Sequence, residues 1–491
     1  MPERNKGEID MRSTGQTDRI VIIGGGISGL SSAFYMLRQA REARRQLQVT
    51  IVDEAPRAGG KIETLRKEGF VIEKGPDSFL ARKQAIIDLA RELGMEEELT
   101  ALNPDARKTY ILHQGKLHPM PAGLMLGIPT DLEALQDSEL LSEEGKLRVS
   151  EELELPAREG DEDESIGSFL ERRLGREAVK TLDEPLLAGI YAGELDKLSL
   201  RATFPQFRAA ELQHGSVIRG MQAGRTAAAA AAAQSDVPEQ VRGSVFLTFR
   251  GGLSSLVERL EQTLAPDVDF RYGARATAIH KQAERGAAPY EVELSSGERL
   301  AADTVVVTTQ GFAAAELLRP LTDVSALDSV RYVSVANVVL AFDKAQFGQT
   351  FDGSGFVIPR TEGRQITACT WTSTKWLHTS PDDKVLLRCY VGRSGAEEFV
   401  QWDDAQLTEV VREEVREIMG ITAEPLFVEV TRLHHSMPQY AIGHVERMAA
   451  FRSRLAEELP GLWVTGAAFD GVGLPDCIRQ GKEAARELLQ P

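Results

Sequence analysis

Residues 19–40, which read RIVIIGGGISGLSSAFYMLRQA, decide the fold of the chain. The β-branched run from Ile20 to Ile23 predicts a buried parallel strand. This run enters a glycine-rich turn, and the residues after the turn predict a helix that continues to about Arg44. A strand, a glycine turn and a helix in this order predict the first half of a dinucleotide-binding unit in an α/β fold.

The glycine turn at residues 24–29 supplies bare backbone where a dinucleotide needs it. Gly24 permits the tight turn, Gly26 lets the backbone approach a pyrophosphate, and Gly29 lets the helix pack close to the strand. Free N–H groups and the dipole at the helix N-terminus favour the negative charge of the pyrophosphate. The residues expected to bind the dinucleotide are Gly24, Gly25, Gly26, Ile27, Ser28 and Gly29. The alternative is a glycine-rich turn without a ligand.

A second strand is predicted from Gln48 to Val52, and it ends at Asp53. An acid about 20 residues after a glycine turn of this kind accepts hydrogen bonds from ribose hydroxyls. Alternation along the strand places Asp53, rather than Glu54, at the strand tip, and Glu54 stays the second choice. The alternative is an acidic residue in a solvated loop.

The segment EAPRAGGKIET at 54–64 favours a flavin over a nicotinamide. It resembles the flavoprotein family that includes amine oxidases, phytoene desaturases and protoporphyrinogen-type oxidases. The resemblance implies that Gly59 and Gly60 pass close to FAD and that Arg57, with Lys61 nearby, offsets pyrophosphate charge. No second glycine fingerprint follows for a nicotinamide. No Cys or His stands in a motif that tethers a flavin, so we expect the FAD to be noncovalent.

The end of the chain is predicted to return to the same site. Residues 461–489 read GLWVTGAAFDGVGLPDCIRQGKEAARELL, with a short strand at 462–465 and a helix that begins near Pro475. Gly466 and the turn Val472-Gly473-Leu474 place bare backbone and a helix start against a ligand. The resemblance implies that this segment lies along the flavin, which makes the FAD domain discontinuous. The alternative is an ordinary strand, turn and helix at the edge of a sheet.

Further motifs make the resemblance specific. They are GPDSF at 75–79, KLHPMPAG at 116–123, EPLLAGIYAGELDKLSLRATFPQF at 184–207, TRLHHSMPQYAIGH at 431–444 and FDGVGLPDCI at 469–478. Together they resemble the bacterial protoporphyrinogen/coproporphyrinogen oxidases, and the similarity extends from about residue 18 to 489. The resemblance implies that Gly75, Pro76, Asp77 and Ser78 bind FAD and that the backbone of Ala276 contacts its adenine. Leu433 stands where many relatives carry Trp, which puts any contact of that Trp in doubt here.

The activity implied by the resemblance is the oxidation of coproporphyrinogen III to coproporphyrin III in haem synthesis. Electrons pass through FAD to O2 in three two-electron steps, and O2 is reduced to H2O2. The form GPDSFLARK resembles the Gram-positive branch, which makes coproporphyrin III. Alternatives are a protoporphyrinogen IX oxidase, another flavin oxidase acting on amines or carotenoids, and a non-enzymatic binder like the Rab escort and dissociation-inhibitor proteins. No catalytic acid or base is assigned.

The four propionates of coproporphyrinogen III require cationic partners. The resemblance implies that Lys83 binds a substrate carboxylate, and the alternative is a solvated lysine at a helix start. Arg82, Arg107 and Lys108 are weaker candidates. The aromatic residues Phe356, Trp371, Trp376 and Tyr390 could stack on a tetrapyrrole, although each is more typical of an ordinary core.

Composition narrows the classes of function. The 491 residues carry a formal net charge of −17, which disfavours nucleic acid as a partner. The first 19 residues lack the apolar core of a secretory signal, and no stretch of 18 apolar residues occurs. The three cysteines lack metal-ligand spacing, so no metal site is expected. We expect a cytoplasmic protein; contact with a membrane surface or a haem-pathway enzyme stays open, and the sequence does not indicate an oligomeric state.

The expected architecture is α/β, or α+β overall, with a Rossmann-like FAD-binding domain, an antiparallel-sheet substrate domain and a helical domain. Ser165 is expected to cap a helix within residues 120–225. The segment RTAAAAAAAQSDVPEQV at 225–241 favours a variable connection, although alanine can also extend a helix. The expected divisions are 1–105 for the first part of the FAD domain, 106–119 for substrate-domain strands, 120–225 for the helical domain that faces a membrane or partner, 226–242 for a low-complexity linker, 243–310 for the second FAD part, 311–430 for the substrate domain and 431–491 for the last FAD part.

Overall fold

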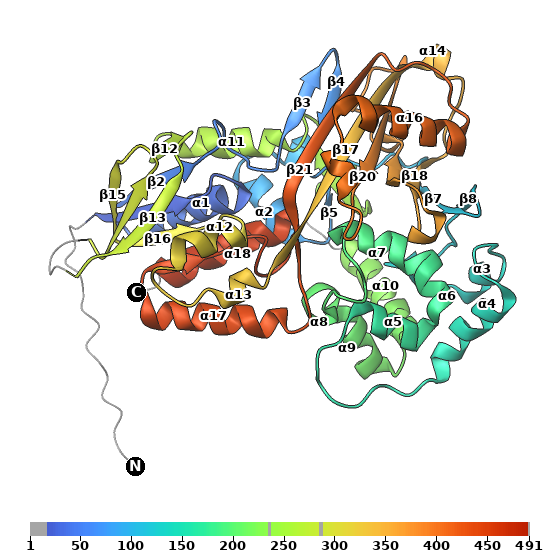
Figure 1. Ribbon diagram of the computed structural model, residues 1–491, viewed down its shortest axis with the longest axis horizontal. Helices are drawn as coiled ribbons and strands as arrows, with labels where there is room; N and C mark the ends of the chain where they lie inside the picture. Colours follow the sequence, from blue (N-terminus) through green and yellow to red (C-terminus); the bar gives the residue numbers. More distant parts are fainter. Residues whose placement is uncertain (1–16, 234–236, 284–287, 490–491) are drawn as a thin grey trace.

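The computed structural model describes residues 17–233, 237–283 and 288–489. Figure 1 shows a lobe built on a parallel sheet, a second lobe built on a long sheet, and a group of helices packed beneath that second sheet. The fold is of the α/β class, as the sequence predicts.

A five-stranded parallel sheet forms the centre of the first lobe, with strand order β12-β2-β1-β16-β22. Its strands are β1 Asp18–Ile23, β2 Leu47–Asp53, β12 Val268–Tyr272, β16 Thr304–Val307 and β22 Leu462–Val464. The beginning, the middle and the end of the chain therefore meet in one sheet.

Both faces of this sheet are covered, which explains the uninterrupted apolar run of β1. Ile20 and Ile22 face a core shared with one group of helices, while Val21 and Ile23 face a second core. The first face packs against α1 Ile27–Glu42, α2 Gln84–Glu92, α11 Ser254–Leu264 and α18 Leu474–Leu489. The second packs against α12 Gly311–Leu318, α13 Ser325–Asp328, α17 His444–Glu458 and the antiparallel strands β13 Ala276–Lys281, β14 Tyr290–Leu294 and β15 Arg299–Ala302.

A seven-stranded sheet forms the second lobe, in the order β21-β17-β20-β19-β18-β7-β8, and its neighbours are antiparallel except for the parallel pair β18–β7. Its strands are β7 Lys108–His113, β8 Lys116–Pro119, β17 Arg331–Asp343, β18 Gly353–Val357, β19 Ile366–Thr370, β20 Lys384–Val391 and β21 Phe427–Gln439. The helix α16 Asp404–Met419 shares a core with this sheet.

Two expected boundaries are wrong. Residues 311–328, expected in the substrate domain, form α12 and α13 and pack on the parallel sheet. The expected boundary between 430 and 431 falls inside β21, because this strand pairs with β17 from Phe427 to Gln439. Packing of α12 and α13 on the parallel sheet sets the first limit, and pairing of β21 with β17 sets the second; local pattern reveals neither.

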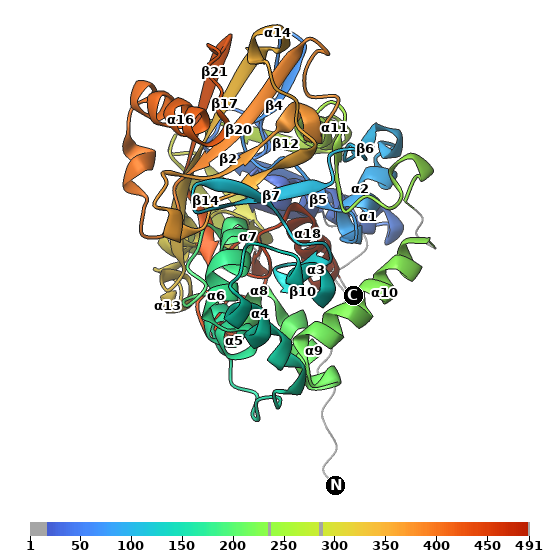
Figure 2. The same cartoon turned by 90° about the vertical axis from the view of Figure 1, so that its right-hand side faces the viewer.

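The helical group contains α3 Leu132–Gln136, α4 Glu143–Ser150, α5 Ile166–Leu174, α6 Arg176–Ala178, a π-helical turn Val179–Asp183, α7 Glu184–Tyr191, α8 Leu200–Thr203, α9 Pro205–His214 and α10 Val217–Ala233. Figure 2 shows α7 between the long sheet and the remaining helices. As the sequence predicts, Ser165 caps α5: its hydroxyl accepts a hydrogen bond from the Ser168 N–H at 3.0 Å.

The expected linker at 226–242 is also wrong in its first half. The alanine tract continues α10 to Ala233, since alanine has the highest helix propensity and the preceding turn of helix already provides the nucleus. Residues 234–236 of this segment lie outside the described residues.

Shorter elements complete the two lobes. They are β3 Thr64–Lys67, β4 Phe70–Glu73, β5 Phe79–Leu80, β6 Leu99–Ala101, β9 Leu124–Met125, β10 Ile128–Pro129, β11 Phe246–Phe249, α14 Lys344–Phe347 and α15 Thr372–Lys375. Across the described ranges, no helix combines the length and the apolar character needed to cross a bilayer.

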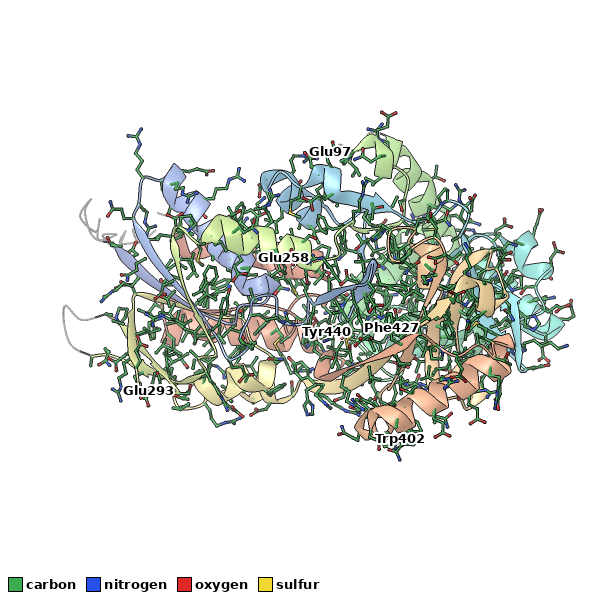
Figure 3. All side chains as sticks on the ribbon, turned by 90° about the horizontal axis from the view of Figure 1, so that it is seen from above. Glu97, Glu258, Glu293, Trp402, Phe427 and Tyr440 are labelled. Carbon is green, nitrogen blue, oxygen red and sulfur yellow. The ribbon has the colours of Figure 1, made fainter. Side chains whose placement is uncertain are left out.

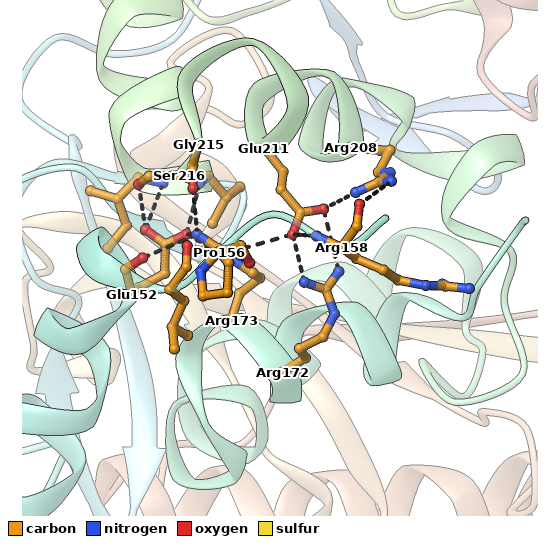
Figure 4. Close-up of polar contacts among 12 residues, drawn as sticks. Glu152, Pro156, Arg158, Arg172, Arg173, Arg208, Glu211, Gly215 and Ser216 are labelled. Carbon is orange, nitrogen blue, oxygen red and sulfur yellow. Dashed lines mark hydrogen bonds and ion pairs between the residues drawn. The ribbon is translucent and has the colours of Figure 1, made fainter. Parts of the chain in front are cut away.

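A buried cluster of charges joins the helices of the helical group (Figure 4). Arg173, which is fully buried, pairs with the fully buried Glu152, and also donates to the carbonyl of Gly215 at 3.0 Å. Glu152 in turn accepts hydrogen bonds from the Val217 N–H at 2.8 Å and the Ser216 hydroxyl, at the start of α10. These bonds attach the N-terminus of α10 to α5 and to the turn after α4.

Tyr440 ties the parts of the molecule together near its centre (Figure 3). Its carbonyl accepts from the Ser199 N–H at 2.8 Å, in the helical group. Its hydroxyl donates to the carbonyl of Ala467 at 2.6 Å, in the segment that precedes α18. Because Tyr440 follows β21 directly, its carbonyl and its hydroxyl together fix the helical group and the C-terminal segment against the long sheet.

Candidate active site

A cavity of about 910 Å³ lies where the three parts of the molecule meet. Its walls come from the carboxyl ends of β1, β2 and β16, the start of α18, the helix α7 and the strands β17, β20 and β21. Open parallel sheets bind ligands at the carboxyl ends of their strands, and this volume is at the upper end of the range for small-molecule sites. The cavity is therefore the candidate site.

The glycines of the first turn have two different reasons to be glycine. Gly24 has φ +113°, and side chains at Gly24 and Gly29 would collide with Thr308 and with the carbonyl of Gly24. A Cβ at Gly26 meets no atom within 4 Å, and Gly26 lines the cavity. The protein itself thus leaves room for a side chain at Gly26, so the bare backbone there serves whatever occupies the cavity.

The N-terminus of α1 faces the same space. Gly26 is its N-cap and makes no side-chain capping bond, no acidic residue stands in the first turn, and Ile27 and Ser28 line the cavity. Unpaired N–H groups and the helix dipole make this end favourable for an anionic group such as a pyrophosphate. The start of α18 contributes Gly473 and Leu474 to another part of the lining.

Asp53 is held at the tip of β2 by the backbone. Its carboxylate accepts from the Gly25 N–H at 2.6 Å and from the Ala55 N–H at 2.7 Å, and it lines the cavity. A carboxylate has about four acceptor positions, so acceptor capacity remains for hydroxyls of a ligand. Glu54 also lines the cavity and is exposed.

The double glycine lies against the first turn. The Gly59 N–H donates to the Gly25 carbonyl at 2.9 Å, and a Cβ at Gly60 would lie 3.3 Å from the Cα of Gly26. Lys61 follows into the cavity, where its ammonium donates to the carbonyl of Ser436. Burial lowers the pKa of Lys61 to about 8.

Arg57 has a different position from the one expected. Its guanidinium donates to the carbonyls of Ala58 and Ile62 at 2.9 Å and to the Glu63 carboxylate at 2.5 Å. It therefore shapes the loop that carries the double glycine and does not line the cavity.

The segment 75–78 forms part of the cavity wall beside this loop. A side chain at Gly75 would collide with the carbonyl of Lys61. Asp77 accepts from the Ser78 hydroxyl at 2.7 Å and lies 3.8 Å from both Lys375 and Arg388. Burial raises the pKa of the Asp77 carboxyl, but the two cations outweigh this effect and hold the pKa below its ordinary value.

Most of the residues expected at the cofactor line this single cavity. They are Gly24, Gly26, Ile27, Ser28, Asp53, Glu54, Gly59, Gly60, Lys61, Gly75, Pro76, Asp77, Ser78, Ala276, Val472, Gly473 and Leu474. Gly25, Gly29, Arg57 and Gly466 lie behind the lining, where they support it; Gly466, with φ +116°, packs against Ser28. Leu433 also lines the cavity.

The cations expected at the substrate lie elsewhere. Lys83 precedes α2, and its ammonium donates to the Asp476 carboxylate at 2.6 Å outside the cavity lining. Lys108 pairs with Asp352 at 2.5 Å, and Arg82 and Arg107 are exposed. Asp476, in the first turn of α18, is close enough to serve as the counter-ion of Lys83.

Other cavity residues were not assigned from the sequence. The wall formed by α7 consists of Glu184, Pro185, Leu186, Ala188, Gly189 and Ile190, and further polar side chains come from Arg360, Arg388 and Arg393. The motif that begins EPLLAGIYAGE marked α7 without giving its residues a role. Strand alternation through β20 places Arg388 and Tyr390 on one face, which was the available signal.

Of the four aromatic candidates, Tyr390 lines the cavity, and burial raises the pKa of its hydroxyl to about 12. Phe356 and Trp371 are buried in the core beside α16, and Trp376 is 2% exposed. Within the described residues, no group of three His, Cys, Asp or Glu side chains is arranged to hold a metal ion.

Comparisons with known proteins agree with this geometry. A profile of the family described as flavin containing amine oxidoreductase matches residues 27–489. The chain is 43% identical to the coproporphyrinogen III oxidase of Bacillus subtilis (strain 168), over 96% of this chain and 97% of that protein. It is 40% identical to the coproporphyrinogen III oxidase of Staphylococcus aureus, over 96% of this chain and 99% of that protein.

A solved structure agrees over nearly the whole length. The crystal structure of a putative protoporphyrinogen oxidase from Exiguobacterium sp. 255-15 matches with a TM-score of 0.84 and 37% identity, covering 96% of this chain and 98% of that one. The strand order, the cavity at the strand ends and these full-length matches lead to one conclusion: the chain belongs to the flavin-containing amine oxidoreductase family, in the group of the bacterial coproporphyrinogen III oxidases.

Proposed function

We propose that this protein is an FAD-dependent oxidoreductase that converts coproporphyrinogen III to coproporphyrin III in haem synthesis, with O2 as the electron acceptor. The observation that carries the proposal is a single cavity that joins a bare glycine turn, suited to a dinucleotide, to a chamber suited to a large anionic ring. Relatives named for this activity match the chain over nearly its full length.

The residues of the cavity fit FAD. The open space beside Gly26 and the uncapped N-terminus of α1 can accept the pyrophosphate. The carboxylate of Asp53 can accept hydrogen bonds from a ribose. The other residues proposed to contact FAD are Gly24, Ile27, Ser28, Glu54, Gly59, Gly60, Lys61, Gly75, Pro76, Asp77, Ser78, Ala276, Val472, Gly473 and Leu474, supported from behind by Gly25, Gly29, Arg57 and Gly466. When bound, FAD accepts two electrons from the substrate as a hydride and transfers them to O2, which leaves as H2O2.

The cysteine in the cavity favours noncovalent binding. Burial raises the pKa of the Cys477 thiol to about 11, so near neutral pH it carries a proton and is a poor nucleophile. FAD should therefore leave the protein on acid precipitation. Yellow colour that stays in the precipitate would contradict noncovalent binding.

The protein's own contribution is to hold the porphyrinogen in a dry chamber of suitable charge. Leu186, Ile190 and Ile358 supply apolar wall, which excludes water from the reacting carbon and matches the face of a tetrapyrrole. Arg393 supplies positive charge beyond the paired Arg360 and Glu184. Positive charge favours a polycarboxylate substrate over a cationic amine or an uncharged carotenoid, the other substrates of related oxidases.

Protoporphyrinogen IX is the second candidate, because the matched structure from Exiguobacterium carries that name. The two substrates are separated by comparing kcat/KM for anaerobically prepared coproporphyrinogen III and protoporphyrinogen IX, with porphyrin fluorescence as the readout. We expect coproporphyrinogen III to be preferred. A preference of about tenfold or more for the divinyl substrate, roughly 1.4 kcal/mol in transition-state binding, would reverse the assignment.

We also propose that the protein works in the cytoplasm. Cys369 and Cys389 are direct cross-strand neighbours in β19 and β20, and both are free and buried. Two adjacent thiols suit a reducing compartment, where disulfides are rare. Fractionation with thiol labelling tests this, and recovery of a disulfide between these cysteines from freshly lysed cells would contradict it.

A further inference from the structure

One end of the cavity, lined by α7 and by the turn after β20, carries an excess of positive charge. The charged side chains there are Glu184, Arg360 and Arg393. Arg275 and Arg388, elsewhere in the lining, lie near the carboxylates of Glu316 at 3.2 Å and Asp77 at 3.8 Å. The charge balance at the α7 end therefore depends on the partners of two arginines.

The guanidinium of Arg360 is engaged by other groups of the protein. Its Nε lies 3.2 Å from the Glu184 carboxylate, and its Nη1 and Nη2 donate to the carbonyls of Ser394 at 2.9 Å and Gly193 at 3.0 Å. It therefore neutralises Glu184 and joins α7 to the turn after β20. Because Glu184 balances its charge, Arg360 adds no net positive charge for a ligand.

Arg393 is different. In the described part of the chain its guanidinium makes no ion pair with a carboxylate, and its one hydrogen bond runs from Nη2 to the carbonyl of Arg364 at 3.4 Å. Burial lowers the pKa of Arg393, and the charge of the neighbouring Arg360 lowers it further. The more distant carboxylates of Glu184 and Glu414 raise this pKa. Glu414 is itself engaged by the N–H groups of residues 365 and 366, both at 2.9 Å. A partly buried guanidinium without a counter-ion faces the cavity.

The backbone fixes the position from which the side chain of Arg393 extends. Gly392 has φ +92°, and a Cβ there would lie 2.5 Å from Val400 and 2.9 Å from the carbonyl of Ser334, so the position requires glycine. The Ala396 N–H then donates to the carbonyl of Arg393 at 2.9 Å and closes a tight turn. Arg393 is thus presented by a rigid turn and not by a flexible loop.

Lys61, the other lining cation without a carboxylate partner in the described ranges, lies beside Gly60 and β21. That is the part of the cavity next to the glycine turn, which the proposed function gives to the cofactor. Arg393 is left as the unpaired cation at the substrate end.

We propose that Arg393 binds a propionate of coproporphyrinogen III at a position where protoporphyrinogen IX presents a vinyl group, and so determines which porphyrinogen is oxidised. Coproporphyrinogen III has four carboxylates, and protoporphyrinogen IX replaces two of them by vinyl groups. A guanidinium donates two parallel hydrogen bonds to a carboxylate, but a vinyl group leaves it buried and unpaired. Sites built to pair with a polar group reject analogues that lack the group more strongly than apolar pockets reject extra methylenes. This inference rests on the proposed function.

The test compares kcat/KM for both porphyrinogens in the wild type, Arg393→Ala and Arg393→Lys, each checked for FAD content and melting temperature. With Arg393→Ala, kcat/KM for coproporphyrinogen III should fall about tenfold or more while that for protoporphyrinogen IX stays within about threefold. Arg393→Lys should fall between wild type and alanine, because lysine keeps the charge but loses the planar fork. The matched control is Arg364→Ala, whose side chain pairs with Glu417 away from the cavity lining and whose removal should leave the ratio unchanged.

A binding measurement provides a readout that does not depend on turnover. The Kd of the wild type for coproporphyrin III, followed by fluorescence titration, should rise about tenfold in Arg393→Ala. Equal losses for both porphyrinogens, or an unchanged ratio, would overturn the role of Arg393 and leave the proposed function standing. A wild-type enzyme that oxidises neither porphyrinogen would instead overturn the proposed function.

Discussion

Gly26 is a residue of the cavity lining at which the chain has space for a side chain and carries none. Local sequence was sufficient here, because the strand, turn and helix of the dinucleotide motif lie within 19–40 and fix one another. Local sequence was not sufficient to place the cations around the cavity. Lys83 finds its partner Asp476 almost at the other end of the chain, and Arg393 reaches the cavity only through the register of a seven-stranded sheet.

Gly26→Val should remove FAD and leave the chain folded. The new side chain points into the open space that the pyrophosphate requires, so it clashes with the cofactor and not with the protein. Flavin absorbance of the purified variant relative to protein should be close to zero. Gly224→Val is the matched control, since a Cβ at this exposed position in α10 also meets no atom within 4 Å. Full flavin content in Gly26→Val would reject the placement.

Lys83→Ala should leave the kcat/KM for coproporphyrinogen III within about threefold of wild type. The side chain pairs with Asp476 outside the cavity lining, in a partly exposed ion pair that should contribute about 1 kcal/mol or less. Steady-state kinetics with porphyrin fluorescence measure this. A loss of tenfold or more with normal flavin content would return Lys83 to the substrate site.

Glu73 gives a pH-dependent prediction. Burial raises its pKa from 4.5 to about 7, although the Leu253 N–H and the Thr64 hydroxyl donate to its carboxylate. Between these two values the folded state holds a proton that the unfolded chain has released, so stability falls as pH rises from about 4.5 to about 7. The neutral Glu73→Gln should therefore match wild type at pH 5 and exceed it by about 1–3 kcal/mol at pH 8.

Urea unfolding at the two pH values measures this difference. The control Glu409→Gln changes an exposed glutamate on α16 and should show the same small effect at both pH values. A Glu73→Gln difference that does not change with pH would contradict the assigned ionisation.

At the scale of elements, the sequence predicted strands and helices where pattern and capping are local. The cap at Ser165 and the strand that ends at Asp53 are examples. It failed where the limit of an element is set from a distance. Residues 437–439 remain strand because β17 pairs with them beyond a bulge, and α10 continues through the alanine tract because its N-terminus is anchored by Glu152.

Removing the side chain of Arg173 should strongly destabilise the attachment of α10 to α5 and to the turn after α4. Arg173→Ala leaves the fully buried Glu152 without its cation, which is expected to lower the free energy of unfolding by about 3–5 kcal/mol. Thermal and urea unfolding measure the change. The control Arg219→Ala breaks a solvent-exposed pair with Glu154 and should cost less than about 1 kcal/mol. Similar effects for the two variants would show that the buried cluster does not stabilise the helical group.

At the scale of the whole molecule, three separated stretches of chain make one parallel sheet, and the long sheet and α7 complete the cavity at its carboxyl edge. The discontinuous arrangement was legible from the glycine motifs at both ends of the sequence. The residues that line the chamber could not be predicted from the sequence. They come from α7, β17, β20 and β21, and only the tertiary structure brings these elements together.

The central claim is that electrons pass from coproporphyrinogen III through FAD to O2. The most direct test mixes the purified holoprotein with coproporphyrinogen III under strict exclusion of oxygen and follows the flavin absorbance. We expect the flavin to bleach and one coproporphyrin III to form for every three flavins reduced. When O2 is admitted, the flavin spectrum should recover with release of H2O2. A flavin that stays oxidised in the presence of excess coproporphyrinogen III would contradict it.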